Sequence, residues 1–173
     1  MNDFSGFERM WAPWRIPWIR ESAGGVNDCF ICDMIKETVD NDRENLLLYR
    51  GEKVIILFNR YPYSNGHLMI APIRHLNDPR QMDVAEWAEI GLLTQLSIQI
   101  LENAMHPHGF NIGWNIGRTS GAGLESHLHQ HIVPRWDGDT NFMPVVGCTK
   151  VISQDLWESY DELKTQLDNL KEG

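Results

Sequence analysis

Ser126-His-Leu-His-Gln-His-Ile-Val-Pro-Arg-Trp136 is the stretch that decides the fold and chemistry of this 173-residue chain. Alternate side chains of an extended strand lie on the same face of a sheet. His127, His129 and His131 therefore share one face, and the residues between them share the other. Three adjacent imidazoles serve no packing purpose, because each one needs a hydrogen-bond partner when it is buried. The run predicts a strand that carries a functional site.

Two chemistries fit three histidines on one face. One is a metal site with three histidine ligands. The other is nucleophilic catalysis by one neutral imidazole, whose second nitrogen donates its proton to a fixed acceptor. The preceding segment, Asn115-Ile-Gly-Arg-Thr-Ser-Gly-Ala-Gly-Leu124, contains three glycines and two hydroxyl residues. Such a loop can turn successive backbone N–H groups toward an anion, which favours a phosphate-binding site beside the histidines.

The flanking sequence predicts an α+β fold whose antiparallel sheet has about five strands. Short β-rich runs cover 46–49 and 54–58, with a hairpin turn between them, and 67–73, 110–115 and 127–134 give the other strands. Helical periodicity predicts a long helix over 83–103, with Asp83 as its N-cap, and a second helix over 153–171. A short helix is expected through 34–37.

We expect three segments along the chain. Residues 1–26 form an aromatic arm, whose Trp11, Trp14 and Trp18 are expected to dock on the domain or on a partner subunit. Residues 27–137 form the main domain, and residues 138–173 form a C-terminal extension with its helix. Two further histidines, His106 and His108, are expected to face solvent.

Composition narrows the class of protein. Hydrophobic residues make up 42% of the chain and the formal net charge is −9, which argues against binding DNA or RNA but allows a small anionic substrate in a local pocket. No apolar run approaches the roughly 18 residues of a membrane span, and the N-terminus lacks a secretory pattern. Three cysteines suit a reducing compartment, so we expect a cytoplasmic protein. Cys148 is expected to be a small packed residue.

The run His127-Leu-His-Gln-His-Ile-Val133 resembles the signature of the histidine-triad (HIT) superfamily, although Gln130 occupies a position that is usually apolar. Cys29-Phe-Ile-Cys32, Phe58-Asn-Arg60 and Gly66-His67 extend the resemblance over roughly residues 27–137. The chain is most similar to the branch of bacterial diadenosine tetraphosphate phosphorylases, through Trp11-Ala-Pro-Trp-Arg15, Gly121-Ala-Gly123 and Pro134-Arg-Trp-Asp-Gly-Asp-Thr-Asn-Phe142. Gly123 and Leu124 stand where hydrolase branches usually carry Gln followed by Ser or Thr.

The resemblance implies a nucleotidyl transferase or hydrolase that acts on the α-phosphate of a dinucleoside polyphosphate or a nucleoside phosphate derivative. His129 would be the nucleophile, His131 would assist the leaving group, and Asn115 would contact phosphate. Substrate contacts are expected from Asn59 at the ribose, from Phe30, Ile31 and Phe58 around the base or in the core, and from Gly121, Ala122 and Gly123 in the loop. His67 is expected to be a structural donor.

The resemblance also implies a structural zinc site made of Cys29, Cys32, His75 and His127, in which two thiolates and two imidazoles would complete a tetrahedron. Unligated thiols and a redox pair remain the alternatives for the two cysteines. A homodimer is implied, with the 83–103 helix and an adjacent strand at its interface. A hydrolase remains possible, as does a protein of another class, a module that binds nucleotide or metal without turnover.

Overall fold

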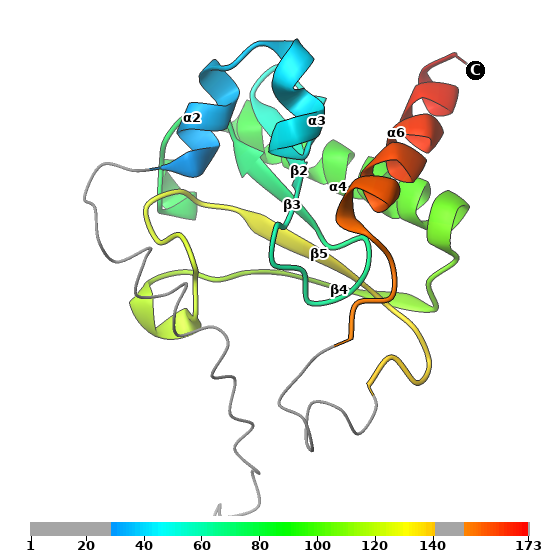
Figure 1. The fold of residues 1–173 in the computed structure, drawn as a ribbon. Helices are drawn as coiled ribbons and strands as arrows, with labels where there is room; N and C mark the ends of the chain where they lie inside the picture. Colours follow the sequence, from blue (N-terminus) through cyan, green and yellow to red (C-terminus); the bar gives the residue numbers. More distant parts are fainter. Residues whose placement is uncertain (1–28, 141–150, 173) are drawn as a thin grey trace, which may run out of the picture.

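A computed structural model describes residues 29–140 and 151–172. Five antiparallel strands form one sheet in the order β1-β2-β3-β5-β4 (Figure 1). The strands are β1 Leu47–Arg50, β2 Val54–Phe58, β3 Leu68–Pro72, β4 Gly109–Trp114 and β5 Gln130–Arg135. The predicted antiparallel α+β sheet is confirmed. The expected N-terminal arm with its tryptophans, Cys148 and Phe142 lie outside the described residues.

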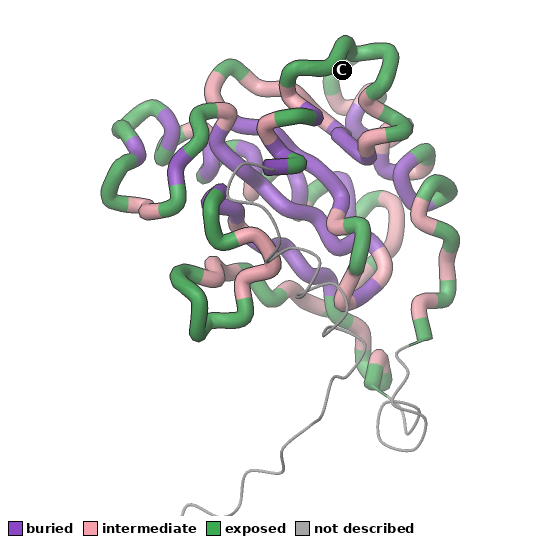
Figure 2. The backbone as a smooth tube through the Cα atoms, turned by 60° about the vertical axis from the view of Figure 1, so that its left-hand side comes forward, coloured by how far each residue is buried: buried purple, intermediate pink, exposed green. Residues whose placement is uncertain are grey.

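Helices cover both faces of the sheet. They are α2 Phe30–Lys36, α3 Asp42–Asn45, α4 Val84–Met105 and α6 Leu156–Glu172, with single 3-10 turns at Val39–Asn41, Pro79–Gln81 and Arg118–Ser120. The helices α4 and α6 pack against one face, and α2 packs against the other. Figure 2 places the buried residues along the central strands, between these two layers.

The alternation of side chains along each strand separates the two cores. In β2, Val54, Ile56 and Phe58 join the cluster beneath α4 and α6, whereas Ile55 and Leu57 join the cluster beneath α2. Every residue of β2 is buried. A continuous apolar run is what a strand covered on both faces requires.

The long helix begins where the sequence predicts it. Asp83 accepts from the backbone N–H of Glu86 at 2.8 Å, while the Glu86 carboxylate accepts from the backbone N–H of Asp83 at 2.8 Å. This capping box satisfies two of the N–H groups that a helix start leaves unpaired. The guanidinium of Arg74 donates to the buried Glu86 carboxylate at 2.8 and 3.0 Å, which ties the helix start to the segment after β3.

The histidine strand begins later than predicted, at Gln130 rather than His127. The backbone N–H of Leu128 donates to the carbonyl of Leu76, at 2.6 Å, and Leu76 lies beyond the end of β3. Residues 127–129 are therefore held by an isolated bond instead of the regular ladder. The predicted alternation still holds, because Leu128 and Ile132 both join the cluster beneath α4.

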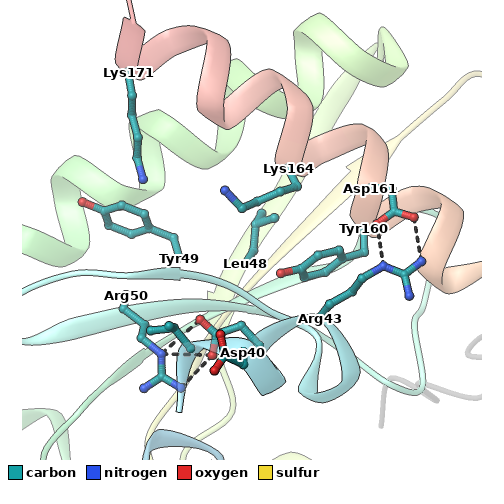
Figure 3. Close-up of a pocket in the computed structure, with 11 residues that line it drawn as sticks. Asp40, Arg43, Leu48, Tyr49, Arg50, Tyr160, Asp161, Lys164 and Lys171 are labelled. Atoms are coloured by element: carbon teal, nitrogen blue, oxygen red, sulfur yellow. Dashed lines mark hydrogen bonds and ion pairs between the residues drawn. The ribbon is translucent and has the colours of Figure 1, made fainter.

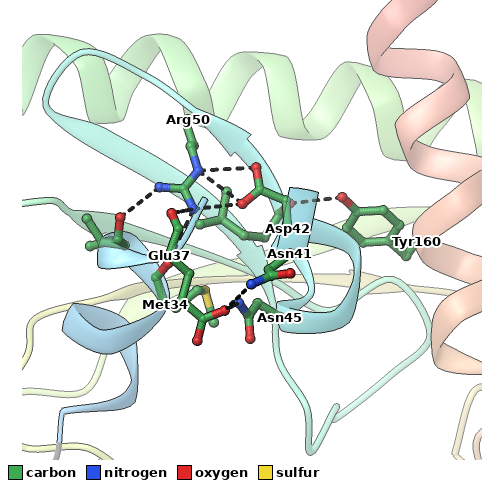
Figure 4. Close-up of polar contacts among 9 residues, drawn as sticks. Met34, Glu37, Asn41, Asp42, Asn45, Arg50 and Tyr160 are labelled. Carbon is green, nitrogen blue, oxygen red and sulfur yellow. Dashed lines mark hydrogen bonds and ion pairs between the residues drawn. The ribbon is translucent and has the colours of Figure 1, made fainter. Parts of the chain in front are cut away.

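The two short N-terminal helices are fastened to the sheet by Arg50 of β1 (Figure 4). Its guanidinium donates to the Asp42 carboxylate at 2.7 Å and to the backbone carbonyls of Met34, Ile35 and Glu37 at the end of α2. The Met34 carbonyl also accepts from the backbone N–H of Glu37 at 3.3 Å, and the arginine adds donors to a helix end whose last carbonyls are otherwise short of partners. The α2 helix, which begins at the first cysteine, is thus fixed at its far end.

Within the described residues, no helix combines the length and the apolar content that crossing a bilayer requires.

Candidate active site and metal centre

The three histidines of the row lie on the face of the sheet opposite α4. His131 stands in β5 between Met69 of β3 and Gly113 of β4. Gln130, one residue away, points to the other face, where its side-chain amide lies 2.8 Å from the hydroxyl of Thr94 in α4. This hydrogen bond explains how a polar residue is accommodated at a position that is apolar in the resembling signature.

A backbone carbonyl two residues earlier fixes which nitrogen of His129 carries the proton. Its Nδ1 lies 2.8 Å from the carbonyl oxygen of His127. A carbonyl oxygen only accepts, so Nδ1 carries the proton and Nε2 keeps the lone pair. The ring is 6% exposed, and burial lowers its pKa from the ordinary value. The neutral, nucleophilic form is therefore favoured at neutral pH.

His131 is oriented by His67, the residue that immediately precedes β3. The backbone N–H of Tyr63 donates to Nδ1 of His67 at 3.0 Å, so the His67 proton is on Nε2. That nitrogen lies 3.0 Å from Nδ1 of His131. The direction of donation is thereby fixed from the Tyr63 backbone through His67, and Nε2 of a neutral His131 is left as a donor. His67, which sequence analysis treated as a structural donor, thus contacts the histidine row.

Asn115 lies beside Nε2 of His131, the ring nitrogen that His67 does not contact. Nδ2 of Asn115 lies 3.4 Å from Nε2 of His131, and an exchange of the amide nitrogen and oxygen would turn the oxygen toward the imidazole proton. From Asn115 the chain continues into the glycine-rich loop, in which Gly117 and Gly121 have φ values of +77° and +82°. These left-handed conformations suit glycine, because it has no Cβ. The loop returns to the row at His127, so it borders the histidines at both ends.

The first histidine of the row belongs to a different cluster. Cys29, Cys32, His75 and His127 bring four potential ligand atoms within 4.8 Å of one another. Nδ1 of His127 lies 3.2 Å from Sγ of Cys29, and Nδ1 of His75 lies 3.1 Å from Sγ of Cys32. Zinc bound tetrahedrally holds neighbouring sulfur and nitrogen ligands about 3.5 Å apart. The cluster therefore has the size and the donor types of a closed zinc site.

The proton positions in this cluster also suit a cation. Nε2 of His127 donates to the Pro72 carbonyl at 2.8 Å, which leaves the lone pair of Nδ1 for the cluster. Burial lowers the pKa of His127 to about 4. The pKa of Cys32 is raised to about 11, first by burial and then by its contact with Cys29. Two thiolates at this spacing repel each other, and a divalent cation relieves that repulsion.

The other expected substrate residues are spread more widely. Phe30 is 45% exposed on α2, whereas Ile31 is fully buried beneath it. Phe58 packs beneath α6, on the face opposite the histidines, with its ring 5.8 Å from that of Tyr160. The structure therefore places Ile31 and Phe58 in the core. Asn59 accepts from the backbone N–H of Tyr61 at 2.9 Å, within the loop that precedes His67.

Two expectations for other histidines are met by the structure. His106 and His108 are exposed, as predicted. His106 ends α4 in a left-handed conformation, with φ +49°. Neither residue belongs to the cluster of two cysteines and two histidines or to the histidine row.

The three histidines of the row do not form a common metal site. The described residues contain one group of potential ligands, and His127 is its sole member from the row. Nδ1 of His129 faces a carbonyl and Nδ1 of His131 faces His67. The geometry therefore disfavours the alternative of a three-histidine metal module.

A hollow of about 500 Å3 lies elsewhere, between β1 and α6 (Figure 3). Its charges are largely compensated internally. Arg43 pairs with Asp161 at 2.7 Å, Arg50 pairs with Asp42, and the ammonium of Lys171 lies 4.6 Å from the centre of the Tyr49 ring. The hollow therefore leaves little unbalanced charge for a ligand.

Comparisons with known proteins point to one family. The HIT domain model matches residues 41–138. The AP-4-A phosphorylase of Mycobacterium tuberculosis is 36% identical over 163 residues, which cover 92% of this chain and 84% of that protein. A zinc-bound histidine triad family protein from Mycobacterium smegmatis has the same fold, with a TM-score of 0.66, 22% identity and coverage of 86% and 99%. A hypothetical histidine triad nucleotide-binding protein from Sulfolobus tokodaii has a TM-score of 0.64 and 27% identity. The match covers 83% of this chain and 94% of that protein.

Proposed function

Because this chain belongs to the HIT domain family, we propose that it is a phosphorylase that transfers the nucleotidyl group of a dinucleoside polyphosphate through a covalent bond to His129. The observation that carries the proposal is the hydrogen bond from Nδ1 of His129 to the His127 carbonyl, at 2.8 Å. It leaves one neutral, buried imidazole with its Nε2 lone pair available. The similarity to an AP-4-A phosphorylase supports the choice of substrate class.

In the first half of the reaction, Nε2 of His129 attacks the α-phosphorus in line with the departing oxygen. His131, whose Nε2 carries a proton, donates to that oxygen as the bond breaks. Backbone N–H groups of residues 117–124 are assigned to the equatorial phosphate oxygens, where charge stabilisation matters most. Asn115, which lies beside Nε2 of His131, is proposed to contact the phosphate.

In the second half, an acceptor attacks the nucleotidyl-histidine and restores His129. Inorganic phosphate gives a nucleoside diphosphate, and water gives a monophosphate. Gly123 and Leu124 lack the side-chain donors usual in hydrolase branches, which leaves room for a phosphate acceptor. Two displacements on one nucleophile predict ping-pong kinetics.

Phe30 is proposed to contact the nucleobase, since it combines an exposed ring with a position on α2. Asn59 is proposed to bind the ribose hydroxyls, because its amide can both donate and accept. Gly121, Ala122 and Gly123 are assigned to the phosphate loop. Ile31 is fully buried and belongs to the core.

We further propose that Cys29, Cys32, His75 and His127 bind a structural zinc ion. The ligand atoms have the required spacing, and the bond from His127 to the Pro72 carbonyl is typical of histidine ligands. The zinc, when bound, supplies a rigid cross-link between α2, the segment after β3 and the histidine row. Free thiolates as ligands suit a reducing compartment, which supports a cytoplasmic location.

A homodimer through α4 and β4 is also proposed. The outer edge of β4 has no partner strand among the described residues. Trp87 and Ile112 are 44% and 42% exposed. Gly91 lies exposed within α4, and a Cβ there would meet no neighbour within 4 Å. A glycine inside a helix costs about 1 kcal/mol relative to alanine, and a closely approaching second copy would explain it. Gly91→Gln should shift the protein toward monomer in light scattering.

The central test is product identification with diadenosine tetraphosphate. The proposal expects phosphate-dependent formation of ADP with ATP, and a His129→Ala variant that is folded but inactive. Isolation of a nucleotidyl-protein linked at His129 would support the intermediate. Rates that are independent of phosphate, with only AMP and ATP formed, would favour the hydrolase alternative, and turnover in the His129→Ala variant would contradict both.

A further inference from the structure

Arg118 lies in the loop that connects β4 to β5. Three residues earlier, Asn115 contacts Nε2 of His131 at 3.4 Å. At the other end, the loop leads directly into His127, and Leu124 packs against the cluster beneath α2. The loop is therefore confined to the same face of the sheet as His129, between the two ends of the histidine row. Arg118 opens the 3-10 turn of this loop and is exposed.

Arg118 differs from the other arginines that the structure describes. Five of them pair with carboxylates, namely Arg43, Arg50, Arg74, Arg80 and Arg135. A sixth, Arg60, donates to the Glu44 carbonyl at 3.4 Å. Across the described ranges, Arg118 alone among the arginines makes neither an ion pair nor a hydrogen bond. Its guanidinium is left available for an anion from solution.

In a double displacement, the positive charge of Arg118 can bind an oxyanion on the side of phosphorus opposite His129. The leaving group departs from the side of phosphorus opposite Nε2 of His129, and the acceptor later attacks from that same side. A polyphosphate leaving group and an inorganic phosphate acceptor are both oxyanions, so one cation serves both. The chain carries a net charge of −9, which disfavours phosphate binding without local compensation. Arginine matches phosphate with two parallel hydrogen bonds.

We propose that Arg118 binds the phosphate acceptor at this position and so favours phosphorolysis over hydrolysis. This inference rests on the proposed nucleotidyl-His129 function. An oxygen of the bound phosphate forms a bond to the α-phosphorus, and the bond from phosphorus to Nε2 of His129 breaks. The electron pair returns to the imidazole, and a nucleoside diphosphate leaves. No oxidant, reductant or further reactant is needed.

The test compares Arg118→Ala with Arg118→Lys and with wild type, using diadenosine tetraphosphate and increasing inorganic phosphate. Losing a charged hydrogen bond predicts a KM for phosphate raised about 10- to 100-fold in Arg118→Ala. The ratio of ADP to AMP at fixed phosphate should fall in parallel. Arg118→Lys keeps the charge but loses the paired geometry, so its KM should be intermediate.

Arg43→Ala is the matched control, because it removes the same charge at an exposed pair with Asp161 on α6. It should leave the KM for phosphate unchanged. An Arg118→Ala variant with a wild-type KM for phosphate would overturn the inference, as would an equal rise in the control. A higher KM for diadenosine tetraphosphate alone would place Arg118 on the leaving polyphosphate and would also overturn it. If wild type formed no ADP, the proposed function itself would fail, and that outcome is separate from the behaviour of Arg118.

Discussion

Replacing His67 with alanine should slow catalysis without removing any group proposed to touch the substrate. His67 is fully buried, and its Nε2 lies 3.0 Å from Nδ1 of His131. Its removal deletes the hydrogen bond to Nδ1 of His131 and the acceptor that the Tyr63 N–H uses. His131 can then rotate or adopt the other tautomer, which places its proton away from the leaving oxygen.

The size of the fall in kcat can be calculated from the hydrogen bond that His67→Ala removes. Leaving one buried partner unsatisfied costs about 1–3 kcal/mol. If that cost is expressed in the transition state, kcat falls about 5- to 150-fold. The loss of kcat should grow as the leaving group becomes more basic, because His131 is proposed to donate to the leaving oxygen. Substituted phenyl esters of AMP measure this dependence, since the ring substituent sets the leaving-group pKa.

His67→Gln provides the comparison, because its amide can donate toward His131 while its oxygen accepts from Tyr63. It should recover part of the lost rate. Denaturant unfolding of each variant separates a folding defect from a catalytic one. A folded His67→Ala variant with wild-type kcat, or with a loss that does not depend on the leaving group, would refute the reasoning.

Three further outcomes are expected. Ser97→Ala should raise the free energy of unfolding by about 1 kcal/mol, because the Ser97 hydroxyl is buried without a partner in the described structure; lower stability in denaturant titrations would contradict this. Arg74→Ala should be less stable than wild type near neutral pH. The Arg74 guanidinium lowers the pKa of the Glu86 carboxyl, so this contribution is present above the ordinary glutamate pKa and disappears as pH falls through the lowered value. The two proteins should therefore converge in acid, and a constant difference in unfolding free energy would argue against the pair. Cys32→Ser should abolish stoichiometric zinc measured by elemental analysis; full zinc retention would exclude Cys32 as a ligand.

Local sequence patterns were sufficient to predict most of the fold. The strand 54–58 and the Asp83 helix start depend on signals within a few residues, namely β-branched composition and the capping box. The short helix α3 was missed, because four residues that include Arg43 are stabilised by distant partners. The start of β5 was missed for the same reason, since Leu128 bonds to Leu76 through a contact that its own sequence does not encode.

The candidate site was only partly predictable from the sequence, because contacts between distant residues also determine the proton positions of its histidines. The period of the histidine row indicates that three imidazoles share a face, but it says nothing about which nitrogen of each ring carries a proton. The Pro72 carbonyl, the His127 carbonyl and His67 decide that separately for His127, His129 and His131. Two of these three partners come from β3 or the residue before it. The roles of the histidines are therefore set by how β3 and β5 pair, which is a tertiary property.

One residue joins the two halves of the site. The ring of His127 faces the cysteines through Nδ1, and its backbone carbonyl holds the proton of His129. Any cation bound by Cys29 and Cys32 therefore restrains the ring of His127, whose carbonyl orients the proposed nucleophile His129. The regular ladder begins only at Gln130, so the segment before it is held by the backbone bond from Leu128 to Leu76, by the bond from the His127 ring to the Pro72 carbonyl and by the packing of Leu128 in the core. We therefore expect a metal that never touches substrate to add to these restraints and so to help orient Nε2 of His129.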